Sequence, residues 1–536
     1  MSATSARQNT AGLQVEGLSV RIEGRPLVDG VSFAVRPGRC LALLGESGAG
    51  KTLTVRALLG LLPEGAESDA AVLEIDGVDA RGLGERAWRT VRGARIALVS
   101  QDALVSLDPL RRIGAEVAEP LEIHRRRSGL TRDARSEQVR ALLGAVAIPD
   151  PVRRMRQYPH ELSGGLRQRA LIASALAASP AVLVADEPTT ALDATVQARV
   201  LDLLREIADR GTAVVLVSHD IGAVRRIADD VVVLKDGVVV ERGTAAQVLA
   251  TPVQEYTREL VRAGSIAPRT GRAEPGGVVL RAIGVGKSFD RPVLQDASFV
   301  LRQGMTLGVV GESGSGKTTL ARILVGVERP DAGTLERSES TPRVQLVPQN
   351  PLGAFDPRWT VGRSLREALE AGGVRRGLRA ERAAALLAEV GLDPELARRR
   401  PLQLSGGQRQ RAAIARALAA NPEVLVLDEP VSALDATVRA RILTLLVRLQ
   451  RDRGLTMVLI SHDLDVVAAV ADEVLVLRDG IVVEQGRVAE IFTDPRHPFT
   501  RALIEAGAGG AGRHGSVADV DPGRGGQDAG EQLDLP

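Results

Sequence analysis

The sequence is poor in two residue types that often reveal a function. Aromatic residues make up only 2% of its 536 residues, and cysteine occurs once, as Cys40. A single cysteine excludes an intramolecular disulfide, a zinc site built on cysteines and an iron–sulfur cluster held by cysteines. Because Cys40 lies in an apolar segment, we expect it to be a small buried side chain and not a reactive thiol.

The chain also lacks a charge imbalance and a long apolar run. It carries 69 Lys and Arg against 67 Asp and Glu, so no net attraction to nucleic acid is expected. No apolar run approaches the roughly 18 residues that would span a bilayer, and residues 1–10 lack the apolar stretch of a signal peptide. These features predict a soluble, cytosolic protein that reaches a membrane only through partners.

Four motifs occur twice and in the same order, which indicates an internal repeat. They are Gly-Glu-Ser-Gly-Ala-Gly-Lys-Thr at 45–52 (with Ser for Ala at 311–318), Leu-Ser-Gly-Gly at 162–165 and 404–407, Asp-Glu-Pro at 186–188 and 428–430, and Ser-His-Asp at 218–220 and 461–463. The predicted organisation is a flexible N-terminus at 1–10, copies at 11–265 and 278–507, a linker containing Pro and Gly at 266–277, and a disordered tail at 508–536.

Short aliphatic runs alternate with helical patterns in both copies. In the first copy the runs are 41–44, 96–99, 182–185 and 214–217. Continuous aliphatic runs of this length are typical of a parallel sheet that is buried on both faces. The sequence therefore predicts an α/β fold for each copy.

The segment 45–52 follows an apolar strand and precedes a helical pattern at 53–62, the context that a phosphate-binding loop requires. Its glycines allow backbone N–H groups to surround an anion, and the helix N-terminus adds positive potential. A single match could be a glycine-rich turn, but two matches favour ATP binding. The predicted ATP-binding residues are Gly45, Glu46, Ser47, Gly48, Ala49, Gly50, Lys51 and Thr52, and Gly311, Glu312, Ser313, Gly314, Ser315, Gly316, Lys317 and Thr318.

Two acidic residues follow each other at the end of an aliphatic run in each copy. Asp186 and Asp428 would hold Mg²⁺ together with the hydroxyls of the loop threonines. Glu187 and Glu429 point differently along an extended chain and would act as general bases toward water. A strand-end capping pair is the alternative, and it is disfavoured because each pair follows a phosphate loop.

Further polar residues follow short strands in both copies. Gln101 and Gln349 could reach the metal or the attacking water, and His219 and His462 could donate to a γ-phosphate oxygen. Each could instead be an ordinary surface or turn residue, but their positions in the repeat favour a role in the site.

The two Leu-Ser-Gly-Gly segments predict a second anion site in each copy. A serine N-cap followed by glycines presents a hydroxyl and free amides at a helix N-terminus. Each copy would then have two phosphate-binding ends, more than one nucleotide needs. The residues concerned are Ser163, Gly164 and Gly165, and Ser405, Gly406 and Gly407.

Together and twice over, these motifs resemble those of ATP-binding-cassette ATPases, across nearly all of residues 11–507. The resemblance implies two P-loop NTPase cassettes, each with a mainly parallel sheet core, an antiparallel β part and a helical subdomain. It also implies head-to-tail packing, in which each Leu-Ser-Gly-Gly closes over the nucleotide on the opposite phosphate loop. Asp193 and Asp435 match the residues that couple the two sites in that family.

The copies depart from the family pattern in two places. Leu166 follows the first signature, where Gln408 follows the second. Family members stack adenine on an aromatic residue ahead of the phosphate loop; Phe289 is placed for this in the second copy, whereas Ile22 occupies the matching region of the first. We therefore expect weaker adenine packing at the first site.

The stretches after Gln101 and Gln349, and His-Pro-Phe-Thr at 497–500, resemble the peptide and nickel importers. The resemblance implies a motor subunit at the cytoplasmic face of the cell membrane, held there by two integral-membrane permeases that work with an extracytoplasmic solute-binding protein. Nucleic acid is not an expected partner. The segments 102–161 and 350–403 would dock on the permeases. The cargo would be a peptide or a related small solute, with nickel as an alternative.

A soluble tandem cassette ATPase that acts on ribosomes or nucleic acid is the alternative, and the ribosomal proteins are the strongest rival. Such proteins typically have a long, charged, helical linker, whereas 266–277 is short. They also tend to have Arg after Ser-His-Asp, where this chain has Ile221 and Leu464. Both differences favour the importer.

Overall fold

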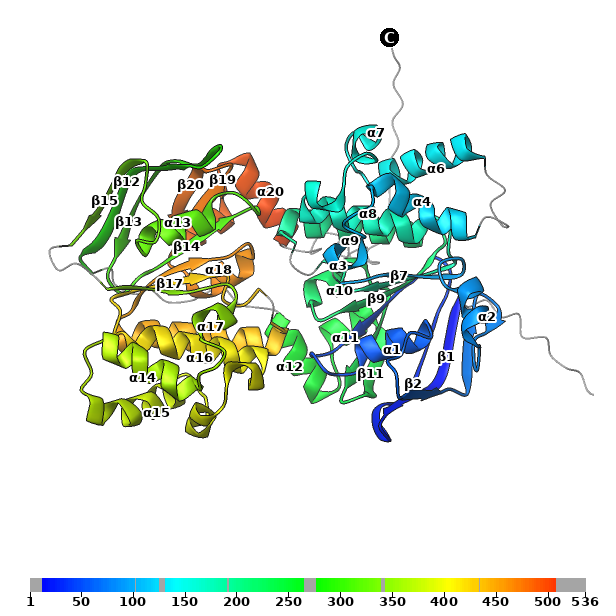
Figure 1. Ribbon diagram of the computed structural model, residues 1–536, viewed down its shortest axis with the longest axis horizontal. Coiled ribbons are helices and arrows are strands. Elements are labelled where there is room, and N and C mark those ends of the chain that lie inside the picture. Colours follow the sequence, from blue (N-terminus) through cyan, green and yellow to red (C-terminus); the bar gives the residue numbers. More distant parts are fainter. Residues whose placement is uncertain are drawn as a thin grey trace, which may run out of the picture.

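The computed structural model describes residues 12–101, 103–124, 131–189, 192–264, 276–338, 343–432 and 434–507. These residues form two halves that lie side by side, with the helical parts at opposite corners (Figure 1). The predicted flexible N-terminus at 1–10, the tail at 508–536 and all but the last two residues of the linker at 266–277 lie outside the described residues.

The first half contains an antiparallel sheet and a larger, mainly parallel sheet. The antiparallel sheet has the order β2-β1-β5-β6, with β4 on β1, and the other has the order β11-β10-β3-β9-β8-β7. The strands are β1 (Leu13–Ile22), β2 (Arg25–Val35), β3 (Cys40–Leu44), β4 (Ala66–Asp69), β5 (Val72–Ile75), β6 (Val78–Asp79), β7 (Ile96–Val99), β8 (Val182–Asp186), β9 (Ala213–Ser218), β10 (Asp230–Lys235) and β11 (Val238–Thr244).

Helices cover both faces of the parallel sheet in the first half and form a separate helical part. They are α1 (Lys51–Leu58), α2 (Glu85–Val91), α3 (Ala103–Ser106), α4 (Ile113–Ile123), α6 (Arg132–Ala145), α7 (Pro151–Arg154), the 3₁₀ turn η1 (Pro159–Glu161), α8 (Gly164–Leu176), α9 (Ala194–Asp209), α10 (Ile221–Ile227), α11 (Ala245–Ala250) and α12 (Glu255–Gly264).

The second half repeats this plan, but a single bridge between Gln295 and Ile481 joins its two sheets into one. Its order is β15-β12-β13-β20-β19-β14-β18-β17-β16. The strands are β12 (Val278–Ser288), β13 (Pro292–Arg302), β14 (Thr306–Gly311), β15 (Ala332–Arg337), β16 (Val344–Val347), β17 (Val424–Asp428), β18 (Thr456–Ile460), β19 (Glu473–Arg478) and β20 (Ile481–Arg487).

The helical elements of the second half occur in an order similar to that of the first half. They are α13 (Lys317–Leu324), η2 (Pro351–Ala354), α14 (Val361–Ala371), η3 (Arg376–Leu378), α15 (Arg379–Glu389), η4 (Pro394–Arg398), η5 (Pro401–Gln403), α16 (Gly406–Ala419), α17 (Ala436–Arg453), α18 (Leu464–Val470), α19 (Val488–Thr493) and α20 (Pro498–Gly507).

The predicted α/β architecture is confirmed. In the first half β3, β7, β8 and β9 contain the four aliphatic runs and pair in parallel. Every residue of β3 and β9 is buried, as expected of strands covered on both faces. The structure thus contains the predicted parallel core, antiparallel part and helical part in each half.

The bounds of one predicted helix were wrong. The pattern at 53–62 predicted its start two residues too late, because α1 begins at Lys51 immediately after the loop. The helix ends at Leu58 because Gly60 adopts a left-handed backbone with a φ of 60°. A Cβ atom on Gly60 would lie 2.4 Å from the ring of Trp88, so the turn also needs a residue without a side chain.

The two halves are joined by reciprocal helix contacts. Helix α12 of the first half packs on α17 of the second, and α20 of the second packs on α9 of the first. Figure 1 shows α12 and α20 lying between the halves. The last helix of each half therefore touches the other half close to its Ala-Leu-Asp segment.

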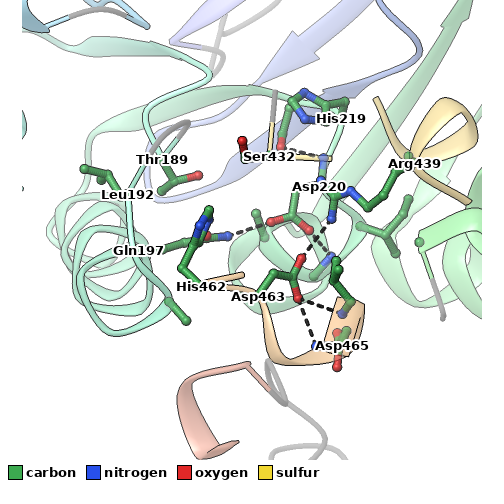
Figure 2. A pocket seen from close by; sticks show the side chains of 18 of the residues that line it. Thr189, Leu192, Gln197, His219, Asp220, Ser432, Arg439, His462, Asp463 and Asp465 are labelled. Carbon is green, nitrogen blue, oxygen red and sulfur yellow. Dashed lines mark hydrogen bonds and ion pairs between the residues drawn. The ribbon is translucent and has the colours of Figure 1, made fainter. Parts of the chain in front are cut away.

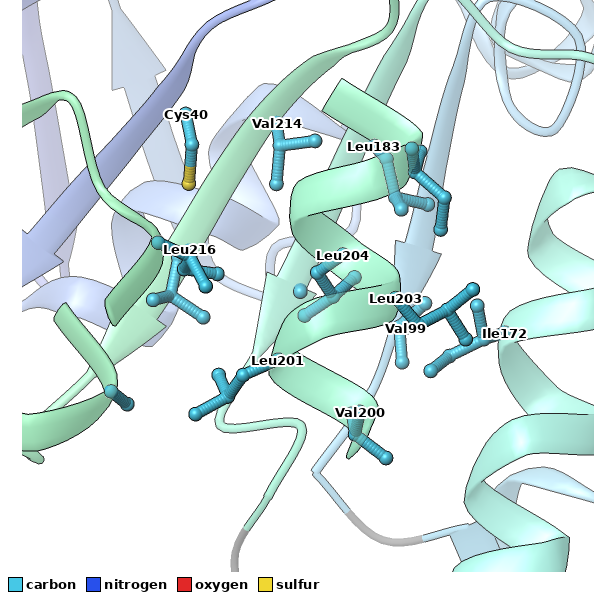
Figure 3. Packing of buried hydrophobic residues seen from close by; sticks show 14 of the residues in the cluster. Cys40, Val99, Ile172, Leu183, Val200, Leu201, Leu203, Leu204, Val214 and Leu216 are labelled. Atoms are coloured by element: carbon cyan, nitrogen blue, oxygen red, sulfur yellow. The ribbon is translucent and has the colours of Figure 1, made fainter. Parts of the chain in front are cut away.

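Cys40 lies at the start of β3 inside the core of the first half, near Val214 and Leu216 (Figure 3). It is a free thiol with no exposed surface. Burial raises the pKa of Cys40 to about 12. The expectation of a buried cysteine is confirmed, and a raised pKa disfavours the thiolate, which is the reactive form.

We predict that the Cys40 thiol of the folded protein will not react with Ellman's reagent at pH 8. A pKa near 12 leaves at least about 10³-fold less thiolate than an exposed cysteine has at that pH. The measurement is the rate of labelling with and without denaturant, with Cys40→Ala as the blank. Rapid stoichiometric labelling of the folded protein would contradict this prediction.

Candidate active sites

Each phosphate loop leaves the end of a central strand and enters a helix. In the first half, Lys51 Nζ donates to the carbonyl oxygens of Gly45 at 2.7 Å and Glu46 at 2.8 Å. The second loop repeats both bonds, from Lys317 to Gly311 at 2.8 Å and Glu312 at 2.7 Å. Each lysine head is thus held over the loop where a phosphate would lie.

The two loop lysines are buried, and burial lowers the pKa of Lys51 and of Lys317 below the ordinary value. Nearby carboxylates act against this effect and favour the charged form. For Lys51, they include Glu187 and Asp186 of its own half. A buried lysine surrounded by carboxylates is suited to bind a polyanion such as a nucleotide.

The strand-end aspartates lie next to the loop threonines. Burial, followed by the adjacent glutamate, raises the pKa of both Asp186 and Asp428, while Thr52 and Thr318 hydrogen-bond to them and oppose the rise. Among the described residues, Oδ1 of Asp428 is buried without a hydrogen-bond partner. A free carboxylate oxygen beside a hydroxyl fits the oxygen ligands that a hard divalent cation prefers.

The following glutamate has the same two neighbours in each half. Glu187 accepts a hydrogen bond from Gln101 at 3.1 Å and contacts His219 Nδ1 at 3.0 Å. In the second half the corresponding distances from Glu429 are 2.9 Å to Gln349 and 3.2 Å to His462. The sequence predicts Gln101 near the metal or the attacking water, and His219 near the γ-phosphate. It does not predict that both side chains contact the glutamate.

Both glutamates adopt an unusual backbone conformation. The φ angle is 47° at Glu187 and 48° at Glu429, in the left-handed region that non-glycine residues rarely adopt. Such strain is kept where the surrounding structure defines a side chain's direction closely. Here it turns the glutamate away from the aspartate before it and toward the histidine.

The second glutamate–histidine pair favours its charged form. Burial raises the pKa of Glu429, but the hydrogen bond and charge of His462 outweigh it and lower the pKa overall. Burial likewise lowers the pKa of His462, and Glu429 outweighs it and raises the pKa. Glu429 is therefore a carboxylate near neutral pH, as a general base must be.

The two signature segments differ at the helix cap. Ser405 caps α16, where its Oγ accepts from Gln408 N and Gln408 Oε1 accepts from Ser405 N. Ser163 precedes α8 without a side-chain cap bond. Leu166 also has no side-chain oxygen to accept from Ser163 N, as Gln408 does from Ser405 N, so the first signature has no capping box.

The second signature glycine of each half allows a close approach between helices. A Cβ atom on Gly165 would lie 2.4 Å from Val196 Cγ1, and one on Gly407 would lie 2.4 Å from Val438 Cγ1. The signature helix therefore packs directly on the helix that begins at the Ala-Leu-Asp segment. Gly164 and Gly406 have more open surroundings.

Side chains from each half reach the phosphate loop of the other. The charge of Asp435 acts on Lys51, and the charge of Asp193 acts on Lys317. Thr437 Oγ1 also donates a hydrogen bond to Glu46 Oε1. Thr437 had not been predicted as a site residue, although its place two positions after Asp435 was a usable signal.

A cavity of about 150 Å³ lies between the halves and is lined by Ser-His-Asp residues of both. Figure 2 shows Asp220 and Asp463 facing each other there. Asp220 accepts from Gln197 at 2.6 Å, and Asp463 pairs with Arg439 at 3.1 Å. Asp465 also lines this cavity, and sequence reasoning had missed it.

The two residues at the positions predicted to contact adenine differ, as the sequence suggested. Phe289 is 56% exposed, with the Lys287 ammonium 5.5 Å from its ring centre, so its ring is available for stacking. Ile22 in the matching region of the first half is half-buried at the end of β1. Adenine stacking at Phe289 remains a prediction.

Known families match both halves of the chain. Residues 28–190 and 294–432 match the family described as ABC transporter. The chain belongs to the ATP-binding-cassette transporter ATPases. Residues 483–508 match the family described as Oligopeptide/dipeptide transporter, C-terminal region, which places the chain in the oligopeptide, dipeptide and glutathione importer branch. The predicted family and fold class are confirmed.

Relatives of similar length share this organisation. The "Peptidoglycan transport ATP-binding protein YejF" of Agrobacterium fabrum is 42% identical, over 89% of this chain and 92% of the relative. The "Glutathione import ATP-binding protein GsiA" of Pectobacterium atrosepticum is 37% identical, over 92% of this chain and 89% of the relative. The chain is accordingly an ATP-binding importer ATPase, and ATP is its nucleotide.

Solved structures support the fold alone. The "RNase-L Inhibitor" aligns with a TM-score of 0.62 over 86% of this chain and 88% of that one, at 21% identity. A likeness at this level carries no function, and the importer relatives decide against the ribosomal alternative. None of the helices formed by the described residues is long and apolar enough to cross a membrane.

We predict that Asp465 makes the folded protein less stable as pH rises. Desolvation beside the cavity, followed by the charges of Asp463 and Asp220, raises the pKa of Asp465 to about 6, although its side chain keeps an exposed surface. The folded state therefore holds a proton that the unfolded chain releases near pH 4, and stability falls between these pH values. Asp465→Asn should raise Tm above pH 6, and the gain should shrink toward pH 4.

The matched control is Gly222→Asp, which places a carboxylate at the equivalent position of the first half. It should lower Tm at pH 7.5, because it adds negative charge to the same cavity. A gain from Asp465→Asn that is equal at every pH would show that this carboxylate is not the titrating group.

Proposed function

We propose that the chain hydrolyses ATP at two composite sites to energise uptake of peptides or related small solutes. One observation carries the proposal. In each half, a strand-end glutamate holds a glutamine and a histidine beside a phosphate loop, and an aspartate of the other half acts on the lysine of that loop. Neither half lacks a group that the reaction requires.

Each site combines residues of both halves. One site would use Lys51, Gln101, Asp186, Glu187 and His219 with Ser405, Gly406 and Gly407. The other would use Lys317, Gln349, Asp428, Glu429 and His462 with Ser163, Gly164 and Gly165. Closure would bring each signature helix N-terminus to the nucleotide, where its free amides can hold phosphate oxygens.

Mg²⁺ fits beside each phosphate loop. Asp186 with Thr52, and Asp428 with Thr318, would hold it together with the nucleotide and water. When bound, it would neutralise charge on the β- and γ-phosphates. The lysine must leave its loop carbonyls to meet the phosphates, so ATP replaces bonds that the loop now makes within itself.

The chemical step depends on the glutamate. As a carboxylate, Glu187 or Glu429 would accept a proton from the attacking water. The histidine beside it would hold the glutamate in its strained direction and donate to the γ-phosphate. The glutamine would orient the same carboxylate and the water.

The proposed cargo class follows from the relatives. Their printed names refer to peptidoglycan and to glutathione, both of which contain peptide bonds or peptide-like units. The match of residues 483–508 to the oligopeptide/dipeptide C-terminal region agrees with this class. A peptide or peptide-containing solute is therefore favoured over nickel.

Import requires membrane permease partners, and we propose two of them with an extracytoplasmic solute-binding protein, which would hold the chain at the cytoplasmic face. An exposed surface on the helical part of the first half is suited to contact one permease. We call it the docking face: Leu110, Arg112, Val152, Arg153 and Arg156, all exposed. Backbone bonds from Ile113 to Gln157 and from Gly114 to Met155 hold its two segments together.

We predict that Glu187→Gln and Glu429→Gln will each lower ATP hydrolysis at their own site. Loss of the general base should slow that site by roughly 10²-fold or more. The measurement is turnover in the assembled transporter, with each variant alone and both together. Nucleotide binding should be retained, which controls for folding. If one replacement leaves the rate unchanged, that site does not hydrolyse ATP.

We predict that charge reversal on the docking face will uncouple the chain from the membrane. Arg112→Glu, Arg153→Glu and Arg156→Glu together should abolish membrane association and peptide uptake, while the isolated chain keeps its ATPase activity. The matched control is Arg140→Glu on α6, which is exposed but pairs with Glu137 of its own helix. Unchanged uptake in the triple variant would place docking elsewhere.

A further inference from the structure

The first phosphate loop is held by a residue that none of its motifs includes. Tyr256 lies near the start of α12, and its Oη accepts a hydrogen bond from Glu46 N at 3.1 Å. Its ring lies under the Lys235 ammonium, 4.9 Å from the ring centre, which fixes the ring beside the end of β10. A tyrosine hydroxyl therefore contacts the loop backbone from outside the loop.

The Tyr256 bond holds a peptide group that the loop lysine also holds. Glu46 N belongs to the same peptide plane as the carbonyl oxygen of Gly45, which accepts from Lys51 at 2.7 Å. The N–H group and the carbonyl oxygen of this peptide therefore each have a side-chain hydrogen-bond partner. When Lys51 turns toward a phosphate, the Tyr256 bond is the one that still holds this peptide in its present orientation, among the hydrogen bonds that the described residues make to it.

The same loop residue is also tied to the other half. Thr437 Oγ1 donates to Glu46 Oε1, and Thr437 lies in the first turn of α17. Helix α12, which carries Tyr256, packs on α17. Glu46 is therefore contacted through its backbone by Tyr256 and through its side chain by the opposite half.

The second half has the same local arrangement without the hydroxyl. Phe499 lies near the start of α20, and the Arg478 guanidinium lies 5.0 Å from its ring centre at the end of β19. The approach to each helix is also equivalent. A glutamate accepts two backbone N–H groups there, as Glu241 does from residues 253 and 254 and Glu484 does from residues 496 and 497.

Phe499 thus occupies the position of Tyr256 but cannot accept a hydrogen bond from the second loop. The two phosphate loops have nearly the same sequence, yet only the first has a tyrosine hydroxyl as an anchor. The difference lies outside both phosphate loops, since Phe499 belongs to the His-Pro-Phe-Thr segment at 497–500 and Tyr256 follows the first cassette's last strand.

We propose that Tyr256 is a positioning residue for nucleotide binding at the first phosphate loop, where its hydroxyl keeps the Gly45–Glu46 peptide oriented after Lys51 has moved to the phosphates. A loop that keeps its shape has less to reorganise when ATP binds, so affinity rises. The anchor partly offsets the missing aromatic residue for adenine at this site. The proposal rests on the assignment of residues 45–52 as a phosphate loop.

The test uses the full chain with Lys317→Ala, so that binding reports on the first loop. We would measure the Kd for a fluorescent ATP analogue with and without Tyr256→Phe. Loss of one neutral hydrogen bond of about 1 kcal/mol should weaken binding about fivefold. The single variant, with both loops intact, should show a raised KM for ATP and a kcat within about twofold of the parent.

The matched control is Tyr158→Phe, which removes the only other tyrosine hydroxyl of the chain, far from the loops in sequence. It should leave Kd and KM unchanged. Equal Kd values for Tyr256→Phe and its parent, or equal weakening by Tyr158→Phe, would overturn the proposal. So would a lowered Tm together with an unchanged Kd for the folded fraction, which a merely structural role predicts.

A further variant separates failure of this proposal from failure of the loop assignment. Lys51→Ala in the Lys317→Ala chain should abolish the remaining binding. If it does not, residues 45–52 are not the phosphate loop. If it does and Tyr256→Phe has no effect, the loop assignment stands and the anchor is refuted.

Discussion

The architecture depends on a lysine ammonium buried at the head of each phosphate loop. A buried charge is tolerated only with hydrogen bonds and opposite charges around it. Each lysine donates hydrogen bonds to two carbonyl oxygens of its own loop, and strand-end acids and an aspartate of the other half supply the opposite charge. The same constraint therefore brings the parallel strands, the loop and the facing half to one place, which is also where a polyphosphate fits.

The surroundings of the two phosphate loops are not equivalent. The glutamate, glutamine and histidine repeat with nearly the same distances. Their surroundings differ among the described residues: of the two signature serines Ser405 alone forms a capping box, Phe289 has an exposed ring where the first half has Ile22, and Tyr256 bonds to the first loop where the second half has Phe499. The proposed catalytic groups are thus duplicated, while the contacts around them differ between the two sites.

The sequence predicted what depends on local pattern and little of what depends on packing. Aliphatic runs located β3, β7, β8 and β9, and the motifs named the residues that meet at each loop. The contacts of Asp465 and Tyr256 could not be predicted, because each depends on how a helix packs against another element distant in sequence. The position of Thr437 two residues after Asp435 was a usable signal, but its partner Glu46 follows from the packing of the halves. The glutamate contacts of Gln101 and His219 were missed because the strained backbone at Glu187 sets that direction.

Because both halves belong to one chain, each of these differences always lies in the same half of the pair. In a symmetric pair of identical cassettes, every loop would have the same anchor and every cavity wall the same charges. In the proposed arrangement the loop that Tyr256 contacts would always face the signature of the second half. Leu110 of the docking face belongs to the first half, and the equivalent position of the second carries Arg358 paired with Asp356. Under the proposed docking each permease would meet a different surface, and a difference in nucleotide affinity between the loops would reach one particular side of the membrane partner.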